Sequence, residues 1–224
     1  MSDPCDVLLV DRDAGDSNII TRTLARGGYT CIVASGAESA WEIVVQHRPK
    51  VILSNWEPPG TDGLELCRRV REAPEFMATC FVMVTGCRES VQREIALDAG
   101  VDDYLLKPVD RAILMARVRV GIRMWDVNEQ LRQAAITDGL TGLYNHDHLN
   151  TIIERELNRS RRYGGCLGLI MLDLDHFKAV NDTYGHLTGN ETLVEVARIL
   201  TETVRDVDTV GRFGGEEFAV VLCN

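Results

Sequence analysis

The first half of the chain alternates short apolar runs with amphipathic stretches. The apolar runs fall at residues 7–10, 30–34, 51–53, 81–84 and 104–106, and the amphipathic stretches at 17–27, 35–47, 63–72, 90–99 and from 110 onward. Continuous apolar strands that alternate with helices predict an α/β fold, a doubly wound five-stranded parallel sheet with helices on both faces. The ligand site of such a sheet lies at the carboxyl ends of its strands. Asp11, Asn55, Thr85 and Lys107 each fall at such an end.

Two acidic clusters stand out in the last third of the chain. The apolar run 166–172 predicts a buried strand, so Asp173 and Asp175 lie where that strand ends. The segment GGEEF at 214–218 lies between two strand-like runs and predicts a hairpin turn that presents Glu216. Acids that converge from a strand end and a hairpin can hold a hard cation such as Mg²⁺. Either cluster alone is equally consistent with a solvated acidic turn.

The segment between residues 110 and 136 predicts one helix, because only the tolerated Gly121 interrupts the helix-forming residues. One stripe recurs at spacings of four and three, compatible with a short coiled-coil seam: Leu114, Val118, Gly121, Trp125, Asn128 and Leu131. The first turns would pack on the sheet of their own domain. Beyond residue 124 the stripe needs another partner, and a second copy of the chain is the simplest one. We therefore expect a homodimer.

Composition limits the class of protein. A chain of 224 residues exceeds one average domain, and its net charge of −10 argues against a nucleic-acid-binding face. No apolar run approaches the roughly 20 residues that span a bilayer, and the N-terminus has no signal-peptide pattern. The seven cysteines show no metal-type spacing and are typical of a reduced protein. We expect a cytoplasmic protein with no nucleic-acid or membrane partner.

Three ordered motifs in the second half point to one family. They are DGLTGLYN at 138–145, LDLDHFKAVNDTYGH at 172–186 and GGEEF at 214–218. Together they resemble the GGDEF domain of the diguanylate cyclases, which condense two GTP into cyclic di-GMP. The resemblance implies the N-terminal part of an α+β, nucleotidyl-cyclase-like domain. Because family members continue beyond the hairpin, we expect a domain that is incomplete at its C-terminus, and a 224-residue chain that is inactive alone.

The resemblance implies metal and catalytic roles for matching residues. Asp173 and Glu216, with the carbonyl of Leu174, would hold Mg²⁺ or Mn²⁺. Glu216 would also help to deprotonate the attacking 3′-hydroxyl, with Glu217 beside it. Lys178 would supply a cation, and the alternative for it is a solvated side chain.

The same resemblance implies contacts with the nucleotide. Backbone N–H groups at the start of a helix would cradle phosphate, at Asp175, His176 and Phe177. Asn181 falls where the family recognises guanine. Its partner position, an aspartate in the family, is Asn190 here. An asparagine offers one acceptor and one donor where a carboxylate offers two acceptors, which puts guanine selectivity in doubt.

Arg205 and Asp208 form an RxxD sequence that resembles the inhibitory site for cyclic di-GMP in this family. The alternative interpretation is a surface ion pair. Two other functions also stay open for the chain. One is a non-enzymatic sensor of cyclic di-GMP, and the other is an adaptor that acts through dimerisation.

The first half resembles the response-regulator receiver domain of two-component systems. Asp11 matches its acidic metal site, Thr85 its hydroxyl switch residue and Lys107 its lysine-proline pair. Asn55, however, stands in the phosphoacceptor position, and Arg12 stands where a second acid is usual. An amide is a poor nucleophile, and the arginine keeps a cation where a metal would bind. We expect a receiver that is not phosphorylated in the usual way.

The nearest substitutes for the lost carboxylate are Asp13 and Glu57, both displaced along the sequence. We favour instead a receiver that is retained for dimerisation and docking. The sequence thus predicts three parts: a receiver domain over residues 1–124, a helical linker over 125–137 and a GGDEF domain over 138–224.

Overall fold

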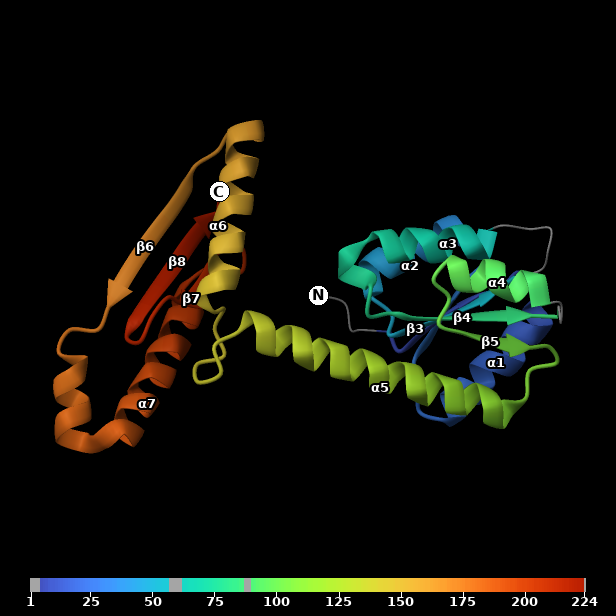
Figure 1. Cartoon of the computed structure of the whole chain (residues 1–224), viewed down its shortest axis with the longest axis horizontal. Coiled ribbons are helices and arrows are strands. Elements are labelled where there is room, and N and C mark those ends of the chain that lie inside the picture. The colour runs from blue at the N-terminus through green and yellow to red at the C-terminus, as the bar shows by residue number, and fades with distance from the viewer. Residues whose placement is uncertain (1–4, 57–61, 87–89, 224) are drawn as a thin grey trace. The chain divides into compact units, whose positions relative to one another are not determined.

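The computed structural model describes residues 5–56, 62–86 and 90–223 (Figure 1). The chain divides into two compact units, residues 1–129 and 130–224, and each is described by itself. The predicted domain limits at residues 124 and 137 stay predictions, because one continuous helix runs through the first of them. No helix in the described ranges has both the length and the apolar character needed to cross a membrane.

The first unit is built on a five-stranded parallel sheet in the order β2-β1-β3-β4-β5. Its strands are β1 (Val7–Val10), β2 (Cys31–Ala34), β3 (Val51–Asn55), β4 (Cys80–Thr85) and β5 (Asp103–Leu106). Its helices are α1 (Ala14–Arg26), α2 (Ala37–His47), α3 (Asp62–Glu72), the short η1 (Pro74–Phe76), α4 (Ser90–Asp98) and α5 (Arg111–Ile136). The predicted doubly wound fold is confirmed.

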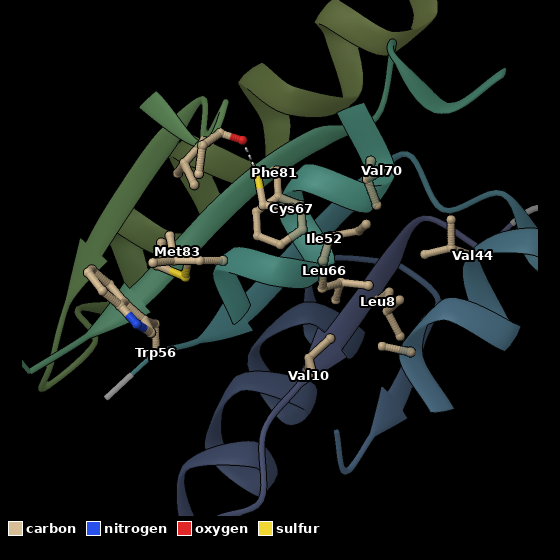
Figure 2. Packing of buried hydrophobic residues seen from close by; sticks show 14 of the residues in the cluster. Leu8, Val10, Val44, Ile52, Trp56, Leu66, Cys67, Val70, Phe81 and Met83 are labelled. Carbon is tan, nitrogen blue, oxygen red and sulfur yellow. Dashed lines mark hydrogen bonds between the residues drawn. The ribbon is translucent and has the colours of Figure 1, made fainter. Parts of the chain in front are cut away.

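Two apolar clusters cover the two faces of this sheet. On one face, Leu8, Ile52 and Phe81 from the strands meet Val44 of α2 and Val70 of α3 (Figure 2). On the other face, strand residues pack on α1 and on the first turns of α5. Alternate strand residues point to opposite faces, so continuous apolar strands feed both clusters.

The first turns of helix α5 are buried on the sheet. Leu114, Val118 and Gly121 are buried on the sheet of their own unit, so they are not available to a second chain. A Cβ atom at Gly121 would lie 2.9 Å from Val51 Cγ2, which explains the glycine at this close contact. The ammonium of Lys50 lies 5.4 Å from the ring centroid of Trp125. The first turns of the helix thus pack on their own sheet, as expected, and any pairing with a second chain is limited to the residues that follow them.

A different apolar stripe of α5 is exposed. Its members are Ile113, Val120, Met124, Val127 and Leu131. From Val120 onward their spacing is four, three and four, which is also compatible with helix pairing. Leu131, shared with the predicted seam, is 64% exposed. Asn128 is exposed too, and its amide donates to the carbonyl of Met124 in its own helix.

The second unit contains a three-stranded antiparallel sheet in the order β6-β8-β7. Its elements are α6 (His146–Tyr163), β6 (Leu167–Asp173), α7 (Phe177–Thr203), β7 (Thr209–Arg212) and β8 (Glu217–Cys223). Phe177, Leu193 and Ala197 of α7 pack with Phe218 of β8 in one core cluster. Leu149 of α6 packs on the same strand in another.

One expectation about this sheet is wrong. Strand β6 was predicted to be buried, but its residues 169–172 are exposed because it is an edge strand paired only with β8 among the described elements. Residues 220–222 form the next apolar run after the hairpin. They lie in β8, the central strand, where residues 220 and 221 pair with both neighbours. A run of apolar residues thus indicates a strand without indicating its place in the sheet.

Candidate functional site

Strand register brings the predicted metal and catalytic residues of the second unit together. Asp173, the last residue of β6, lies opposite Glu217, the first residue of β8. The next backbone amide, that of Leu174, donates to the carbonyl of Glu216 over 3.3 Å. Asp173 and Leu174 therefore meet Glu216 and Glu217, about 40 positions later in the sequence, at one end of the sheet.

The turn between β7 and β8 is closed by its own backbone. The amides of Phe213 and Gly214 both donate to the carbonyl of Glu217, at 2.8 and 3.2 Å. A Cβ atom at Gly214 would collide with the carboxylate of Glu217, so a residue without a side chain fits there. Glu217 is exposed and Glu216 is half-buried. Both acids are thus held on a tight hairpin.

The donors at this end of the sheet suit a hard divalent cation. Asp173 and Glu216 supply carboxylate oxygens, and the Leu174 carbonyl accepts from the Phe177 amide at 3.2 Å and keeps a second lone pair. No group of three or more His, Cys, Asp or Glu side chains converges anywhere in the described part of the chain. A metal here would therefore rest on two carboxylates and a carbonyl.

Helix α7 begins directly behind these residues. His176 at its N-cap has φ of 61°, a left-handed conformation, and its side chain caps no amide. The ring of Phe177 is buried in the core and its amide is taken by the Leu174 carbonyl. Asp175 and Lys178 are exposed. A phosphate at this helix start would thus meet Lys178 and the amides other than that of Phe177.

A kink in α7 brings the two predicted guanine-recognition positions together. Gly185 has φ of 84° and ψ of 161°, which interrupts the helix. Across this kink the carboxamide of Asn181 packs directly on Gly189, which leaves no room for a Cβ atom. Asn190, the neighbour of Gly189, is exposed. Asn181 therefore lies against the residue that precedes Asn190.

Arg205 and Asp208 form the ion pair that was the alternative interpretation of the RxxD sequence. The Arg205 Nε atom donates to Asp208 Oδ2 at 3.1 Å, and the amide of Cys223 donates to Oδ1. Burial raises the pKa of Asp208, but the hydrogen bonds from Arg205 and Cys223 outweigh it, so the pKa is lowered. Asp208 is 2% exposed, whereas Arg205 is 69% exposed. Asp208 therefore holds a guanidinium that faces solvent.

A cavity of about 400 Å³ lies beside this pair. Its lining includes Arg155 and Arg159 of α6 and Val207 of the RxxD segment. The Glu156 carboxylate contacts both arginines, at 3.1 and 3.5 Å. The cavity wall is thus rich in guanidinium groups that the sequence analysis did not single out.

In the first unit, several polar residues at the strand ends have hydrogen-bond or ion-pair partners. The amide of Asn55 donates to Asp11 Oδ1 at 2.9 Å, and Lys107 lies 3.0 Å from Asp16. The Asp13 carboxylate caps α1, where it accepts from the amides of residues 15 and 16. Thr85 is buried at the end of β4. Glu57, the other candidate substitute, lies outside the described residues.

Arg12 is exposed and donates from Nε to the carbonyl of Ser35 at 3.2 Å. Its guanidinium is thereby held against the residue that follows β2, at the carboxyl end of the sheet. Asp11, Arg12 and Asn55 line one cavity, and Thr85 and Lys107 lie at the ends of β4 and β5.

Two family models match the chain. One, described as the response regulator receiver domain, covers residues 7–119, which is half of the chain. The other, described as diguanylate cyclase, GGDEF domain, covers residues 135–224. The chain belongs to the response regulator receiver family and continues into a GGDEF domain. The two resemblances inferred from the motifs are confirmed.

Known relatives share this arrangement in whole or in part. Response regulator PleD of Caulobacter vibrioides (strain NA1000 / CB15N) is 29% identical, with 88% of this chain and 49% of PleD covered. Probable diguanylate cyclase DgcC of Escherichia coli (strain K12) is 43% identical over 42% of this chain and 25% of DgcC. A crystal structure of a putative response regulator from Chloroflexus aurantiacus J-10-fl is 28% identical and has a TM-score of 0.50, covering 54% of this chain and 98% of its own. The chain spans about half the length of PleD and a quarter of DgcC.

The GGDEF domain contains one polar contact that the sequence analysis missed. Arg212 Nη1 donates to both carboxylate oxygens of Asp138, at 3.0 and 3.1 Å, and its Nε and Nη2 donate to the carbonyl of Gly215. Thr141 donates to Asp138 as well. Burial raises the pKa of Asp138, but the hydrogen bonds of Thr141 and Arg212 outweigh it and lower the pKa. The first motif is thereby tied to the GGEEF hairpin, 74 residues away.

Proposed function

We propose that the GGDEF domain of this chain is a diguanylate cyclase that condenses two GTP into cyclic di-GMP. The observation that carries the proposal is the β6–β8 register, which gathers Asp173, Leu174, Glu216 and Glu217 at one end of the sheet. The name of DgcC, a probable diguanylate cyclase, supports the same activity. The domain limits of 1–124, 125–137 and 138–224 remain part of this proposal.

In the reaction, the 3′-hydroxyl oxygen of each GTP attacks the α-phosphorus of the other. Each attack forms one phosphodiester bond and breaks the bond to pyrophosphate, which leaves. Mg²⁺ or Mn²⁺ held by Asp173, Leu174 and Glu216 would supply Lewis-acid stabilisation of the phosphate charge. Glu216 and Glu217 would accept the hydroxyl proton.

The remaining residues of the site would bind and orient the nucleotide. Lys178 and the amides of Asp175 and His176 would hold phosphate at the start of α7. Asn181 and Asn190 would contact guanine, and the packing of Asn181 on Gly189, the neighbour of Asn190, supports this. Asn190 stands in place of a carboxylate and offers guanine one acceptor oxygen where a carboxylate offers two. Its hydrogen bonds to guanine would therefore be weaker.

The reaction needs two GTP sites that face each other, so we propose that the chain acts as a homodimer. The exposed stripe of α5, from Val120 to Leu131, offers an apolar surface for a second copy. The expected location is the cytoplasm, where GTP is available.

We propose that the receiver domain acts without phosphorylation, as a docking and dimerisation module. Asn55 offers no carboxylate to a phosphoryl donor, and its amide is already paired with Asp11. Lys107 is paired with Asp16, and Arg12, which follows Asp11 in the sequence, carries a permanent positive charge. These contacts satisfy much of the pocket without a phosphoryl group.

A second candidate function is non-enzymatic sensing of cyclic di-GMP. It is favoured by Arg205, whose exposed guanidinium is oriented by Asp208 next to the arginine-rich cavity. Calorimetry should show cyclic di-GMP binding that Arg205→Ala weakens strongly, because a guanidinium pairs bidentately with phosphate or guanine. If the variant and the wild type bind cyclic di-GMP with equal affinity, the Arg205–Asp208 ion pair has only a structural role.

The experiment that tests the cyclase proposal is conversion of GTP by the full-length native protein. With Mg²⁺ present, the wild type should form cyclic di-GMP and Glu216→Gln should not. Cyclic di-GMP binding without any turnover would instead support the sensor.

A further inference from the structure

Arg212 links the hairpin that carries Glu216 to a separate loop of the GGDEF domain. Its Nε and Nη2 atoms donate to the carbonyl of Gly215 at 3.1 and 2.6 Å, and its Nη1 atom donates to both carboxylate oxygens of Asp138. The side chains of Arg212 and Asp138 are 15% and 24% exposed. Because a guanidinium is planar and holds its acceptors in a fixed geometry, Arg212 sets the distance between the loop and the hairpin.

The contact with Gly215 acts on the residue that follows it. The carbonyl of Gly215 and the amide of Glu216 belong to one planar peptide group, so fixing the carbonyl also fixes the start of Glu216. Apart from its chain neighbours, no described residue lies within 4 Å of the place that a Cβ atom of Gly215 would take. The Glu216 carbonyl accepts from the amide of Leu174, next to Asp173. Arg212 therefore acts on the stretch of backbone that places Glu216 beside β6.

The loop that contains Asp138 is a firm anchor, because it closes on itself and on two helices. The Asp138 amide donates to the carbonyl of Leu143, and the Asp138 carbonyl accepts from the amide of Gly142. Asn145 ends the loop. Its side-chain amide donates to the carbonyl of Ala135 at the end of α5, and its side-chain oxygen caps α6. One loop thus joins the end of α5, the start of α6 and the hairpin.

Backbone contacts attach the same loop to strand β7. Tyr144 forms an isolated parallel bridge with Gly211, and the Tyr144 carbonyl accepts from the amide of Arg212 at 2.8 Å. A Cβ atom at Gly211 would lie 2.9 Å from this carbonyl, so the two segments touch here. The loop therefore contacts β7 through its backbone and the turn through the Arg212 side chain. Removing that side chain would keep the loop on β7 and release only the turn.

We propose that Arg212 is a positioning residue for the cyclase reaction and that Asp138 is its anchor. Together they hold the peptide group between Gly215 and Glu216, so that Glu216 meets Asp173 at the proposed metal site. The end of α5 belongs to the frame that holds this hairpin. The inference rests on the proposed function, because the metal site is part of that function. The alternative is a contact that only stabilises the fold.

The test measures the affinity of the native protein for Mn²⁺ without any turnover. Binding is followed by the electron paramagnetic resonance of free Mn²⁺ in the presence of 3′-deoxy-GTP, which lacks the attacking hydroxyl. Partial unfolding would lower the number of binding sites and leave the affinity of each remaining site unchanged. Displacement of Glu216 would lower the affinity itself. The thermal midpoint of each variant shows whether it is folded at the assay temperature.

Arg212→Ala should weaken Mn²⁺ binding about tenfold or more, because losing a residue that orients a metal ligand typically costs about 10–100-fold in affinity. Arg212→Lys should recover only part of this loss, since lysine keeps the charge but lacks the planar fork. Asp138→Asn should also weaken binding. The double variant should be no worse than Arg212→Ala, because both residues act through one contact. The matched control Arg198→Ala, in an exposed ion pair with Glu195 on α7, should bind like the wild type.

Three results would overturn the proposal. One is equal Mn²⁺ affinity of Arg212→Ala and the wild type. Another is a variant that loses binding sites without losing affinity, which would make the contact purely structural. The third is an additive loss in the double variant, because the two residues would then act separately. These results leave the proposed function standing, whereas a wild type that binds no Mn²⁺ would overturn the function and this inference with it.

Discussion

Replacing Arg212 by alanine should loosen the contact between the first GGDEF motif and the hairpin. Arg212 makes two hydrogen bonds to Asp138 and two to the carbonyl of Gly215, and its side chain is 15% exposed. Hydrogen bonds to charged groups contribute about 1.5–3 kcal/mol, and breaking a fully buried pair costs more. Since both partners keep some contact with solvent, and Thr141 still donates to Asp138, we expect a loss of about 2 kcal/mol.

The assay is amide hydrogen exchange followed by mass spectrometry. A loss of about 2 kcal/mol corresponds to roughly thirtyfold faster exchange by local opening, and it should be confined to residues 138–145 and the GGEEF turn. The matched control is Arg198→Ala on α7. Arg198 contacts Glu195 and Glu202 at 2.6 to 2.9 Å but is exposed, so its loss should change exchange little. Equal effects of the two substitutions, or no effect of Arg212→Ala, would refute the reasoning.

The same contact predicts a pH dependence. The pKa of Asp138 is lowered in the folded protein from an ordinary value of 3.8. A lowered carboxyl pKa stabilises the folded form above that ordinary value, and this stabilisation is lost as the pH falls through the folded value. The difference between wild type and Arg212→Ala should therefore be full at neutral pH and shrink below about pH 4.

Three other predictions follow from particular contacts. Acetyl phosphate should not label the receiver, because Asn55 lacks a carboxylate. A labile phosphoryl adduct seen by mass spectrometry would contradict this. The double substitution Asn55→Asp with Arg12→Asp should create Mg²⁺ binding. Gly189→Ala should displace the Asn181 carboxamide and weaken GTP binding in calorimetry, whereas unchanged binding would remove Asn181 from the guanine site. Leu131→Glu should shift sedimentation towards monomer, and an unchanged oligomeric state would place the dimer surface elsewhere.

The alternation of apolar runs and amphipathic stretches was sufficient to predict the receiver fold. Continuous apolar strands are required wherever helices cover both faces of a sheet, so the strand positions could be predicted closely. Helix α5 shows the limit of such patterns. A stripe at spacings of three and four is produced equally by packing on a sheet and by packing on another helix. Gly121 belongs to the stripe, but it lies against Val51 and Cys80 of its own sheet.

The candidate site could be predicted where its residues lie in ordered motifs. Asp173 and Glu216 were expected to converge, and the strand register brings them to one end of the sheet. The pair of Asp138 and Arg212 was missed, because no local pattern connects residues 74 positions apart. The buried position of Asp208 was missed for a similar reason, since its third partner is the backbone of Cys223.

The central claim is that the GGDEF domain makes cyclic di-GMP. The most direct measurement is the time course of cyclic di-GMP formation from GTP and Mg²⁺ by the native protein, followed by mass spectrometry. Wild type should form product and then slow as product accumulates, Arg205→Ala should continue without slowing, and Glu216→Gln should form none. A native protein that forms no cyclic di-GMP, or a Glu216→Gln variant that forms it at the wild-type rate, would contradict the account.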